Sequence, residues 1–434
     1  MITNKRIFTL WLPLAAMWLV MGIELPIING VMARLGNVKE NLAAFGITFS
    51  IALIIEAPVI QLFVAGTALT NSRKNYKRLL NFMHILAIGL TLIHLLLGLT
   101  PAYTLLLKHV IGIPEEIIPL SRRSFLLMTP WAAAIGYRRL WQGILIRYEK
   151  TKLVPLTMII RLAATCLVLF TGYFFLELEG AELGGAALGF GVIIGAISGW
   201  YYTRSIIKDD LDDNPDIPEL GWHKLLKFYY PLFLTSLVTF IVRPVMSFGL
   251  ARAAYPIESL AVWPVIISLM FLFRSMAMAY QEVVVSLLNS EQSEEAEERL
   301  NYFARLLGIT LTAGLIILAI SPGSPLLYRY AAGLDSELTG FTRIPTIIVT
   351  LIPGLSALIS WYRGSLIHNN RTGTIAKGTI INSLILMPII LAGPLVSHLP
   401  GAIIAALALT SAMVAETLFL KFNFNNKKDL PLTG

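Results

Sequence analysis

Apolar runs of about 20 residues, the length that an α-helix needs to cross a bilayer, recur along the whole chain. Short polar or charged segments with Gly, Pro and Asn separate these runs. The alternation predicts twelve membrane-spanning helices, and the chain is expected to be an all-α polytopic membrane protein. The expected ranges are 8–33, 42–69, 80–107, 122–146, 153–178, 183–204, 226–251, 259–288, 303–321, 343–366, 376–396 and 400–421.

The two halves of the chain align with one another at two offsets. An offset of 218 residues pairs residues at the start of each half, and an offset of 221 pairs residues farther on. Such duplication is common in transporters, and it predicts two parallel six-helix repeats related by an axis along the membrane normal. We expect an N-terminal lobe at 1–207, a cytoplasmic linker at 208–222 and a C-terminal lobe at 223–434. The aligned pairs are Pro13 with Pro231, Pro26 with Pro244, Arg34 with Arg252, Leu42 with Leu260, Gly143 with Gly364 and Thr151 with Thr372.

Composition and charge agree with a membrane protein. Of the 434 residues, 56% are hydrophobic and 14% are charged, and the formal net charge is +8. The Lys and Arg residues are scattered over short loops, which argues against a nucleic-acid partner, and most of those outside the spans fall on one side. The positive-inside rule therefore predicts an integral protein of the plasma (cytoplasmic) membrane with both termini in the cytoplasm.

Signals of catalysis are missing from the sequence. It contains no G-x-x-x-x-G-K-[ST], H-E-x-x-H or G-x-S-x-G motif, so we expect no enzyme activity, no cofactor and no metal site. The glycine-rich stretch 180–199 resembles a phosphate-binding loop only superficially. Small residues every three or four positions in an apolar helix are more typical of close helix packing.

Ten charged residues fall inside the expected spans. A charge at the bilayer centre costs roughly 2.5 to 3.5 kcal/mol even on the lenient insertion scale, so such residues should face a bundle interior or a wet cavity. Arginines outnumber carboxylates among them, which indicates an interior suited to anions. The arginines are Arg138, Arg139, Arg161, Arg243, Arg274 and Arg363, and the carboxylates are Glu24, Glu56, Glu282 and Glu416.

These residues predict a binding site in a central cleft. We assign substrate binding to Arg243 and Arg274, which lie deep in their spans, and also to Arg138 and Gln281. Pro26 and Pro244 each free a backbone carbonyl and are predicted hinges. We assign coupling or ion pairing to Glu24, Glu56 and Glu282. Alternatives stay open, namely snorkelling for Arg138, Arg139 and Arg363, and structural pairing for Arg161, Glu416 and Glu56.

Several stretches resemble known transporter families. The segments 141–156 and 362–377 are similar to a repeated loop of the superfamily of multidrug, oligosaccharidyl-lipid and polysaccharide (MOP) flippases, and ARLG before NLAAFG resembles its multidrug and toxin extrusion (MATE) group. A closer resemblance is to the progressive ankylosis (ANK) family of exporters. The stretches that carry it are 42–58, 70–80, 121–128, 142–147 and 228–252.

The resemblance implies a MATE-like fold and export of pyrophosphate or related anions such as citrate and nucleotides. It carries a functional role to Arg243 and Pro244, and also to Glu24. Our first hypothesis is therefore a secondary active exporter of a small anion by alternating access, with possible H+ or Na+ coupling and the lipid bilayer as its environment. The alternatives are a cation-coupled MATE-type multidrug exporter, a flippase for a lipid-linked sugar diphosphate, and a non-transporting scaffold or enzyme.

Overall fold

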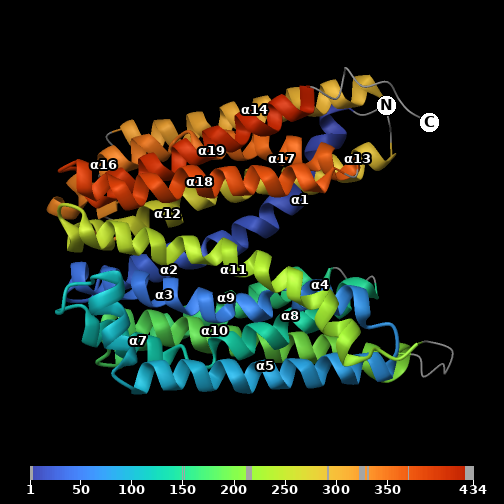
Figure 1. Ribbon diagram of the computed structural model, residues 1–434, viewed down its shortest axis with the longest axis horizontal. Coiled ribbons are helices and arrows are strands. Elements are labelled where there is room, and N and C mark those ends of the chain that lie inside the picture. Colours follow the sequence, from blue (N-terminus) through green and yellow to red (C-terminus); the bar gives the residue numbers. More distant parts are fainter. Residues whose placement is uncertain are drawn as a thin grey trace. The chain divides into compact units, whose positions relative to one another are not determined.

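The computed structural model describes residues 3–148, 150, 152–211, 218–290, 293–321, 328–329, 332–369 and 371–425. Within these ranges the chain is helical almost throughout and forms no β-strand beyond an isolated bridge between Ala254 and Pro400 (Figure 1). Eleven helical stretches of the described residues, some of them made of two consecutive helices, are long and apolar enough to cross a membrane. The predicted all-α polytopic architecture is confirmed.

The remaining predicted span, 122–146, is divided into two helices. Residues 128–130 form a turn between α7 (Ile118–Leu127) and α8 (Trp131–Arg147). The two helices have 10 and 17 residues, so neither is long enough to count among the eleven candidate spans. Pro130 precedes the first residue of α8, a position that suits the fixed φ of proline.

Contacts group the chain into two compact units, which we call unit 1 (residues 1–30 and 249–434) and unit 2 (residues 31–248). The first helix is therefore grouped with the C-terminal residues. The lobe and linker boundaries proposed from the sequence concern the duplication and stay a prediction; residues 212–217 of that linker lie outside the described residues.

Unit 1 contains nine described helices. They are α1 (Asn4–Gly22), α2 (Glu24–Met32), α12 (Pro256–Met278), α13 (Tyr280–Ser290), α14 (Glu294–Ile320), α16 (Ser336–Val349), α17 (Ile352–His368), α18 (Thr372–Val396) and α19 (Gly401–Asn425). Besides α7 and α8, the described helices of unit 2 are α3 (Val38–Ile60), α4 (Leu62–Leu69), α5 (Arg73–Leu99), α6 (Ala102–Leu105), η1 (Leu106–Ile111), α9 (Leu153–Phe175), α10 (Gly180–Ser205), η2 (Ile206–Asp210) and most of α11 (Trp222–Arg252).

Helix boundaries repeat at the two offsets found in the sequence. An offset of 218 carries the break at Gln61, between α3 and α4, onto the break at Ala279, between α12 and α13. The same offset carries Asn37 onto Tyr255, the two described non-glycine residues with a positive φ, 53° and 54°. An offset of 221 carries both ends of α5 onto those of α14, and both ends of α8 onto those of α17. The folded chain thus confirms the internal duplication.

The first helix is interrupted where the sequence predicts a hinge. Pro26 has no N–H, so the carbonyl of Gly22 lacks its helical partner. The helix breaks at Ile23, whose amide closes α1 by donating to Leu19 O at 2.9 Å, and α2 begins at Glu24. The equivalent Pro244 lies inside α11, which is helical without a break, so matching interruptions are not found. The hinge roles of Pro26 and Pro244 stay predictions.

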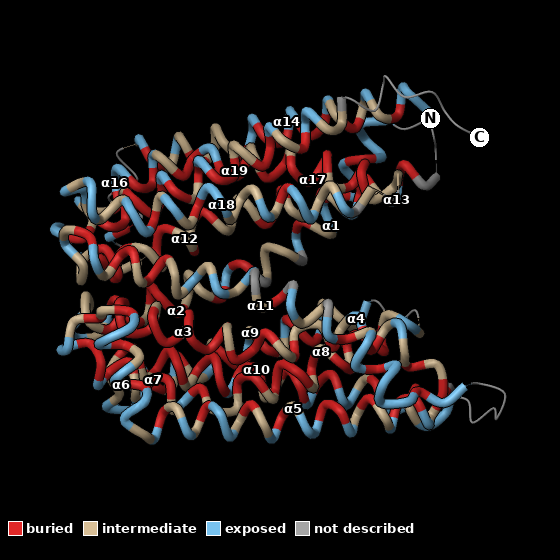
Figure 2. Tube along the Cα trace, in the orientation of Figure 1, coloured by how far each residue is buried: buried red, intermediate tan, exposed pale blue. Residues whose placement is uncertain are grey.

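Small residues allow α10 to pack closely in unit 2, and Figure 2 shows this helix largely buried. A Cβ added at Gly185 would lie 2.6 Å from the carbonyl oxygen of Ser124, and one at Gly189 would lie 2.9 Å from that of Leu127. The glycine-rich stretch is therefore a packing surface, as predicted, and not a phosphate-binding loop.

Candidate functional site

Four arginines and one glutamate meet inside unit 2, and we call them the arginine cluster. Glu56 comes from α3, Arg138 and Arg139 from α8, Arg161 from α9 and Arg243 from α11. The charges of Arg139, Arg138 and Arg161 act on the carboxylate of Glu56, whose own charge acts on Arg243. Positive charges outnumber the negative one by four to one within the cluster. The site is therefore suited to an additional anion.

A tryptophan holds the carboxylate at the centre of the cluster. Trp131 Nε1 donates a hydrogen bond of 2.8 Å to Glu56 Oε2, and both side chains are only 4% exposed. Trp131 is the first residue of α8, so the turn at 128–130 determines where this donor lies. When it is ionised, this carboxylate is a counter-charge for the arginines near it.

Arg243 is the exposed member of the cluster. Its guanidinium carbon lies 5.4 Å from the centroid of the Phe49 ring, and its side chain is accessible rather than covered by protein. An aromatic ring attracts a cation without removing its charge. Arg243 is thus held in place by α3 while its positive charge stays available to a ligand.

Polar contacts hold α11 against α3 around this arginine. Gln61 Nε2 donates to Ser236 Oγ at 2.8 Å, and the hydroxyls of Ser50 and Ser247 lie 3.3 Å apart. Tyr229 donates its hydroxyl to the carbonyl of Pro58. These bonds involve residues on both sides of Arg243 along α11, so they set the position of its backbone.

The other arginines of the cluster are more enclosed. Arg138 is 3% exposed and its Nη1 lies 2.9 Å from Met158 Sδ, while Arg161 is 8% exposed. Gly195 of α10 makes room for both, since a Cβ there would lie 3.2 Å from Arg138 Cδ and 3.3 Å from Arg161 Cβ. Arg139 is half-buried, with its guanidinium carbon 6.0 Å from the Phe63 ring centroid.

The structure brings together some of the predicted site residues and separates others. Arg243, Arg138 and Glu56 belong to the arginine cluster of unit 2, but the other predicted binding and coupling residues belong to unit 1. There, Glu24 is buried at the start of α2, Arg274 is half-buried in α12, and in α13 Gln281 is half-buried and Glu282 is exposed. The roles assigned to all of these residues stay predictions.

Sequence reasoning did not place Arg139 and Arg161 in the site. From the sequence, snorkelling stays open for Arg139 and structural pairing for Arg161, because sequence spacing does not show which helices meet. The signal that both share with Arg138 is an arginine deep in an apolar span, and depth alone would have found them.

Arg363 has a different environment, in unit 1. It forms an ion pair with Glu416, and its Nη2 donates to Thr379 Oγ1 at 3.2 Å. Glu416 is 4% exposed and also accepts from Asn382 Nδ2 at 3.0 Å. Arg363 is therefore neither a snorkelling residue nor an open ligand site. These contacts agree with the structural reading of Glu416, which stays a prediction.

Comparison with known proteins gives matches only at the level of three-dimensional structure. No family model and no curated protein matches the sequence. A MATE family transporter of the MOP superfamily in an inward-facing conformation matches with a TM-score of 0.69 and 16% identity, over 94% of this chain and 96% of that one. The lipid II flippase MurJ, in an inward closed conformation, matches with a TM-score of 0.70 and 19% identity, over 95% and 87%.

The chain has the fold of MATE and MurJ transporters. A third MOP superfamily transporter, from Pyrococcus furiosus, matches this MATE-like chain with a TM-score of 0.65 and 17% identity, over 97% and 96%. That protein is described as having a binding pocket of reverse polarity that suggests a different function. None of these comparisons supports the more specific resemblance to the ANK family.

Proposed function

We propose that this MATE-like protein is a secondary active transporter that exports a small anion, such as pyrophosphate, citrate or a nucleotide, by alternating access. The observation that carries the proposal is the exposed Arg243, about two-thirds of the way along α11, in a cluster in which arginines outnumber carboxylates. We place the protein in the cytoplasmic membrane with both termini inside, from the distribution of its basic residues.

The chemistry of arginine supports an anionic substrate. A planar guanidinium donates two parallel hydrogen bonds to a phosphate or carboxylate, and the bonds are charge-assisted. They are stronger in a site with little water than in bulk solvent. Arg243 would make the first contact, and the more enclosed Arg139 would add positive potential behind it.

Glu56 has a natural role in such a cycle. Without substrate, its carboxylate offsets part of the positive charge of the cluster, and a bound anion takes over that function. A proton or Na+ at Glu56 would offset its charge, so cation occupancy of Glu56 and anion binding would be linked, and this link would couple the two species. The substrate-binding roles of Arg274 and Gln281 and the coupling or ion-pairing roles of Glu24 and Glu282 stay proposals.

The Pyrococcus furiosus neighbour supports this reading by analogy. Its reverse-polarity pocket indicates that the polarity of the binding site varies within this fold. The fold by itself therefore does not require the substrate to be an organic cation, although a cation-coupled multidrug exporter is the alternative that MATE neighbours suggest.

A flippase for a lipid-linked sugar diphosphate is the second candidate. The match to the lipid II flippase MurJ favours it, because a diphosphate would also be bound by clustered arginines. The two candidates differ in whether the transported diphosphate carries a lipid tail.

The test is transport by proteoliposomes that contain the purified chain. We would measure flux of labelled pyrophosphate and citrate, of a fluorescent organic cation and of a fluorescent lipid-linked diphosphate. Each substrate would be tested with the native chain, with Arg243→Ala and with the control Arg299→Ala, which removes an exposed arginine paired with Glu295 at 2.8 Å on α14.

We expect anion flux in the native chain and in the control, and a loss of at least tenfold in Arg243→Ala. Flux of the organic cation that survives Arg243→Ala, with no anion flux, would overturn the proposal in favour of the drug exporter. Movement of the lipid-linked diphosphate alone would favour the flippase.

A further inference from the structure

A groove of about 570 Å³ runs along the surface of unit 2. Its lining is almost entirely apolar and aromatic, unlike that of the charged arginine cluster. Helix α8 packs against both α5 and α10 and forms the floor, and the other two helices form the walls. Lining residues come from all three helices. Among them are Tyr76, Leu80 and His84 of α5, Ala133, Tyr137 and Trp141 of α8, and Trp200 of α10.

Two polar side chains of the groove bond to each other. His84 Nδ1 and the hydroxyl of Tyr137 lie 2.6 Å apart in a hydrogen bond, and the Tyr137 ring stacks on that of Trp141 at 5.5 Å. Gly199 of α10 lies beside the Trp141 side chain, and a Cβ there would be at ordinary contact distance, 3.6 Å from Trp141 Cβ. The groove therefore offers an apolar channel with flat aromatic walls, which suits a hydrocarbon chain better than a polar solute.

Basic residues continue the groove at one end. On α5, Arg73 and Lys77 fall on the helix face of Leu80 and His84. On α10, Arg204 lies one turn beyond Trp200 on the lining face, with its guanidinium carbon 4.2 Å from the Tyr201 ring centroid.

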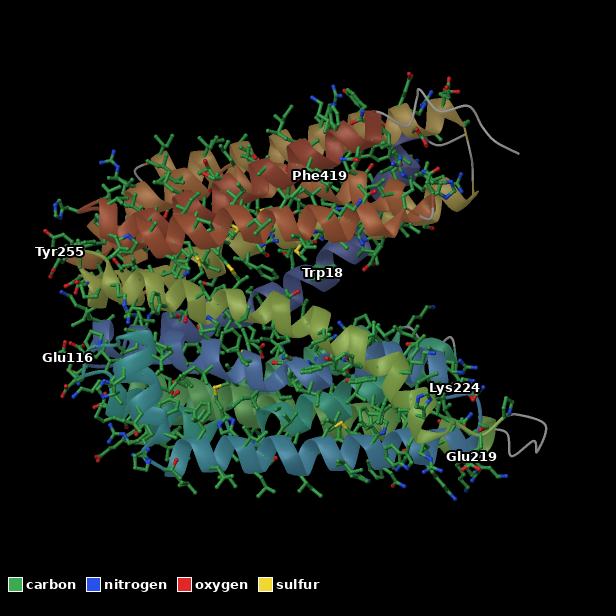
Figure 3. All side chains as sticks on the ribbon, in the orientation of Figure 1. Trp18, Glu116, Glu219, Lys224, Tyr255 and Phe419 are labelled. Atoms are coloured by element: carbon green, nitrogen blue, oxygen red, sulfur yellow. The ribbon has the colours of Figure 1, made fainter. Side chains whose placement is uncertain are left out.

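A hydrogen bond joins the two basic ends. Arg73 Nη2 donates to the carbonyl oxygen of Lys208 at 2.9 Å. Among nearby carboxylates, Asp209 is exposed, and Glu219 is paired with Arg78 at 3.1 Å. Figure 3 shows Glu219 at the opposite end of unit 2 from Glu116, so the basic residues lie at an end of the helical bundle.

The rise along α5 from the basic residues to His84 matches the thickness of one leaflet of a bilayer. From Arg73 to His84 the helix advances about 16 Å at 1.5 Å per residue. This is about half of a hydrocarbon core of ~30 Å. A lipid with its headgroup at the basic end would therefore reach the middle of the membrane along the aromatic walls.

The duplication provides an internal comparison. At the offset of 221, α5 corresponds to α14, and Arg73 and Lys77 correspond to Glu294 and Glu298. The first turn of α14 is acidic, with Glu294, Glu295 and Glu297. Since an equivalent helix forms with the opposite charge, the fold does not require basic residues at the start of α5.

We propose that this groove binds one anionic phospholipid. An acyl chain lies along Tyr76, Tyr137, Trp141 and Trp200, and the acidic headgroup lies among the basic residues of α5, α10 and η2 (Arg73, Lys77, Arg204 and Lys208). The shared features of lipid sites, an apolar channel and a basic end at the headgroup level, are both present. The site is separate from the proposed transport function and does not depend on it.

The experiment is lipid retention by the full chain. Protein would be reconstituted into vesicles of equal parts phosphatidylglycerol and phosphatidylcholine, extracted in mild detergent, and weighed by native mass spectrometry. We expect one retained phosphatidylglycerol per chain. The double variant Lys77→Gln/Arg204→Gln should lower its retention at least fivefold, and the control Arg299→Gln, at the position of α14 equivalent to Arg78, should leave it unchanged.

A second variant keeps the proposal testable if the double variant is poorly folded. Ala133→Leu fills the floor of the groove, and it should lower retention of phosphatidylglycerol at least threefold in monodisperse protein. Equal retention of phosphatidylcholine, or full retention of phosphatidylglycerol by both variants, would overturn the proposal.

Discussion

The guanidinium of Arg243 lies over the ring of Phe49 in a cation–π contact, with the guanidinium carbon 5.4 Å from the ring centroid. The Phe49 ring also lies edge-on to Trp131 at 6.1 Å, and Trp131 donates to the carboxylate of Glu56. Two aromatic rings thus connect the exposed arginine of the cluster with its buried carboxylate. We expect a movement of Arg243 or of Glu56 to shift the other group through the rings of Phe49 and Trp131.

The ring beneath Arg243 is the first element to test. Replacing Phe49 by Leu removes a cation–π contact worth about 0.5 to 2 kcal/mol, without removing the charge. We expect a weaker apparent affinity for the transported anion, by roughly twofold to thirtyfold, with a nearly unchanged maximal rate. Concentration-dependent flux in proteoliposomes measures both quantities. Phe49→Tyr, which keeps the ring face, is the matched control, and equal effects of the two substitutions would contradict the role given to the ring.

The carboxylate of Glu56 is expected to control coupling. Glu56→Gln removes its charge but keeps a group that can accept from Trp131, which donates to Oε2 at 2.8 Å. Anion exchange should persist when pH and Na+ concentration are equal on both sides of the membrane. The cluster then has one more uncompensated positive charge, which favours anion binding. Flux driven by a pH or Na+ gradient should fall at least tenfold.

A comparison variant separates charge from structure at this position. Trp131→Phe keeps the charge of Glu56 and removes its hydrogen bond, so it should retain gradient-driven flux to a larger extent than Glu56→Gln. Gradient-driven flux that is unchanged in Glu56→Gln would rule out Glu56 as the coupling group.

The ion pair between Arg363 and Glu416 should be structural. Glu416 is 4% exposed, so Arg363→Met alone leaves a buried carboxylate uncompensated and is expected to cost about 3 to 5 kcal/mol. The double variant Arg363→Met/Glu416→Leu should recover most of this loss. Thermal unfolding in detergent provides the order of stability. The exposed pair of Arg299 and Glu295 is the control, and its removal should cost less than about 1 kcal/mol.

Close packing of α4 on α8 predicts a contrast between two glycines. A Cβ at Gly143 would meet the carbonyl oxygen of Phe63 and the amide nitrogen of Thr67, both backbone atoms, whereas nothing lies within 4 Å of a Cβ at Gly89. Gly143→Ala should therefore lower stability by about 1 to 3 kcal/mol. Gly89→Ala should leave it unchanged or raise it by up to about 1 kcal/mol, because alanine is the better helix former. Thermal unfolding of the two variants, side by side, decides whether this contact is as tight as described.

The sequence by itself determined the all-helical membrane architecture, the approximate limits of eleven of the twelve expected spans and the duplication. Each of these depends on local properties, namely apolar length or a repeated pattern along one stretch of chain. The same offsets of 218 and 221 that align residues also align the ends of α5 with α14 and of α8 with α17.

Only the tertiary structure decided which charged residues meet. It brought Arg139 and Arg161 to Glu56, paired Arg363 with Glu416, and assigned Arg274 and Arg243 to different units. In a soluble protein the apolar stripe of a helix marks its inward face. A membrane helix is apolar toward lipid as well as toward its neighbours, so its sequence carries little record of which face is covered. The partners of an arginine inside a span are therefore set by the spatial order of the helices, which no single stretch of sequence contains.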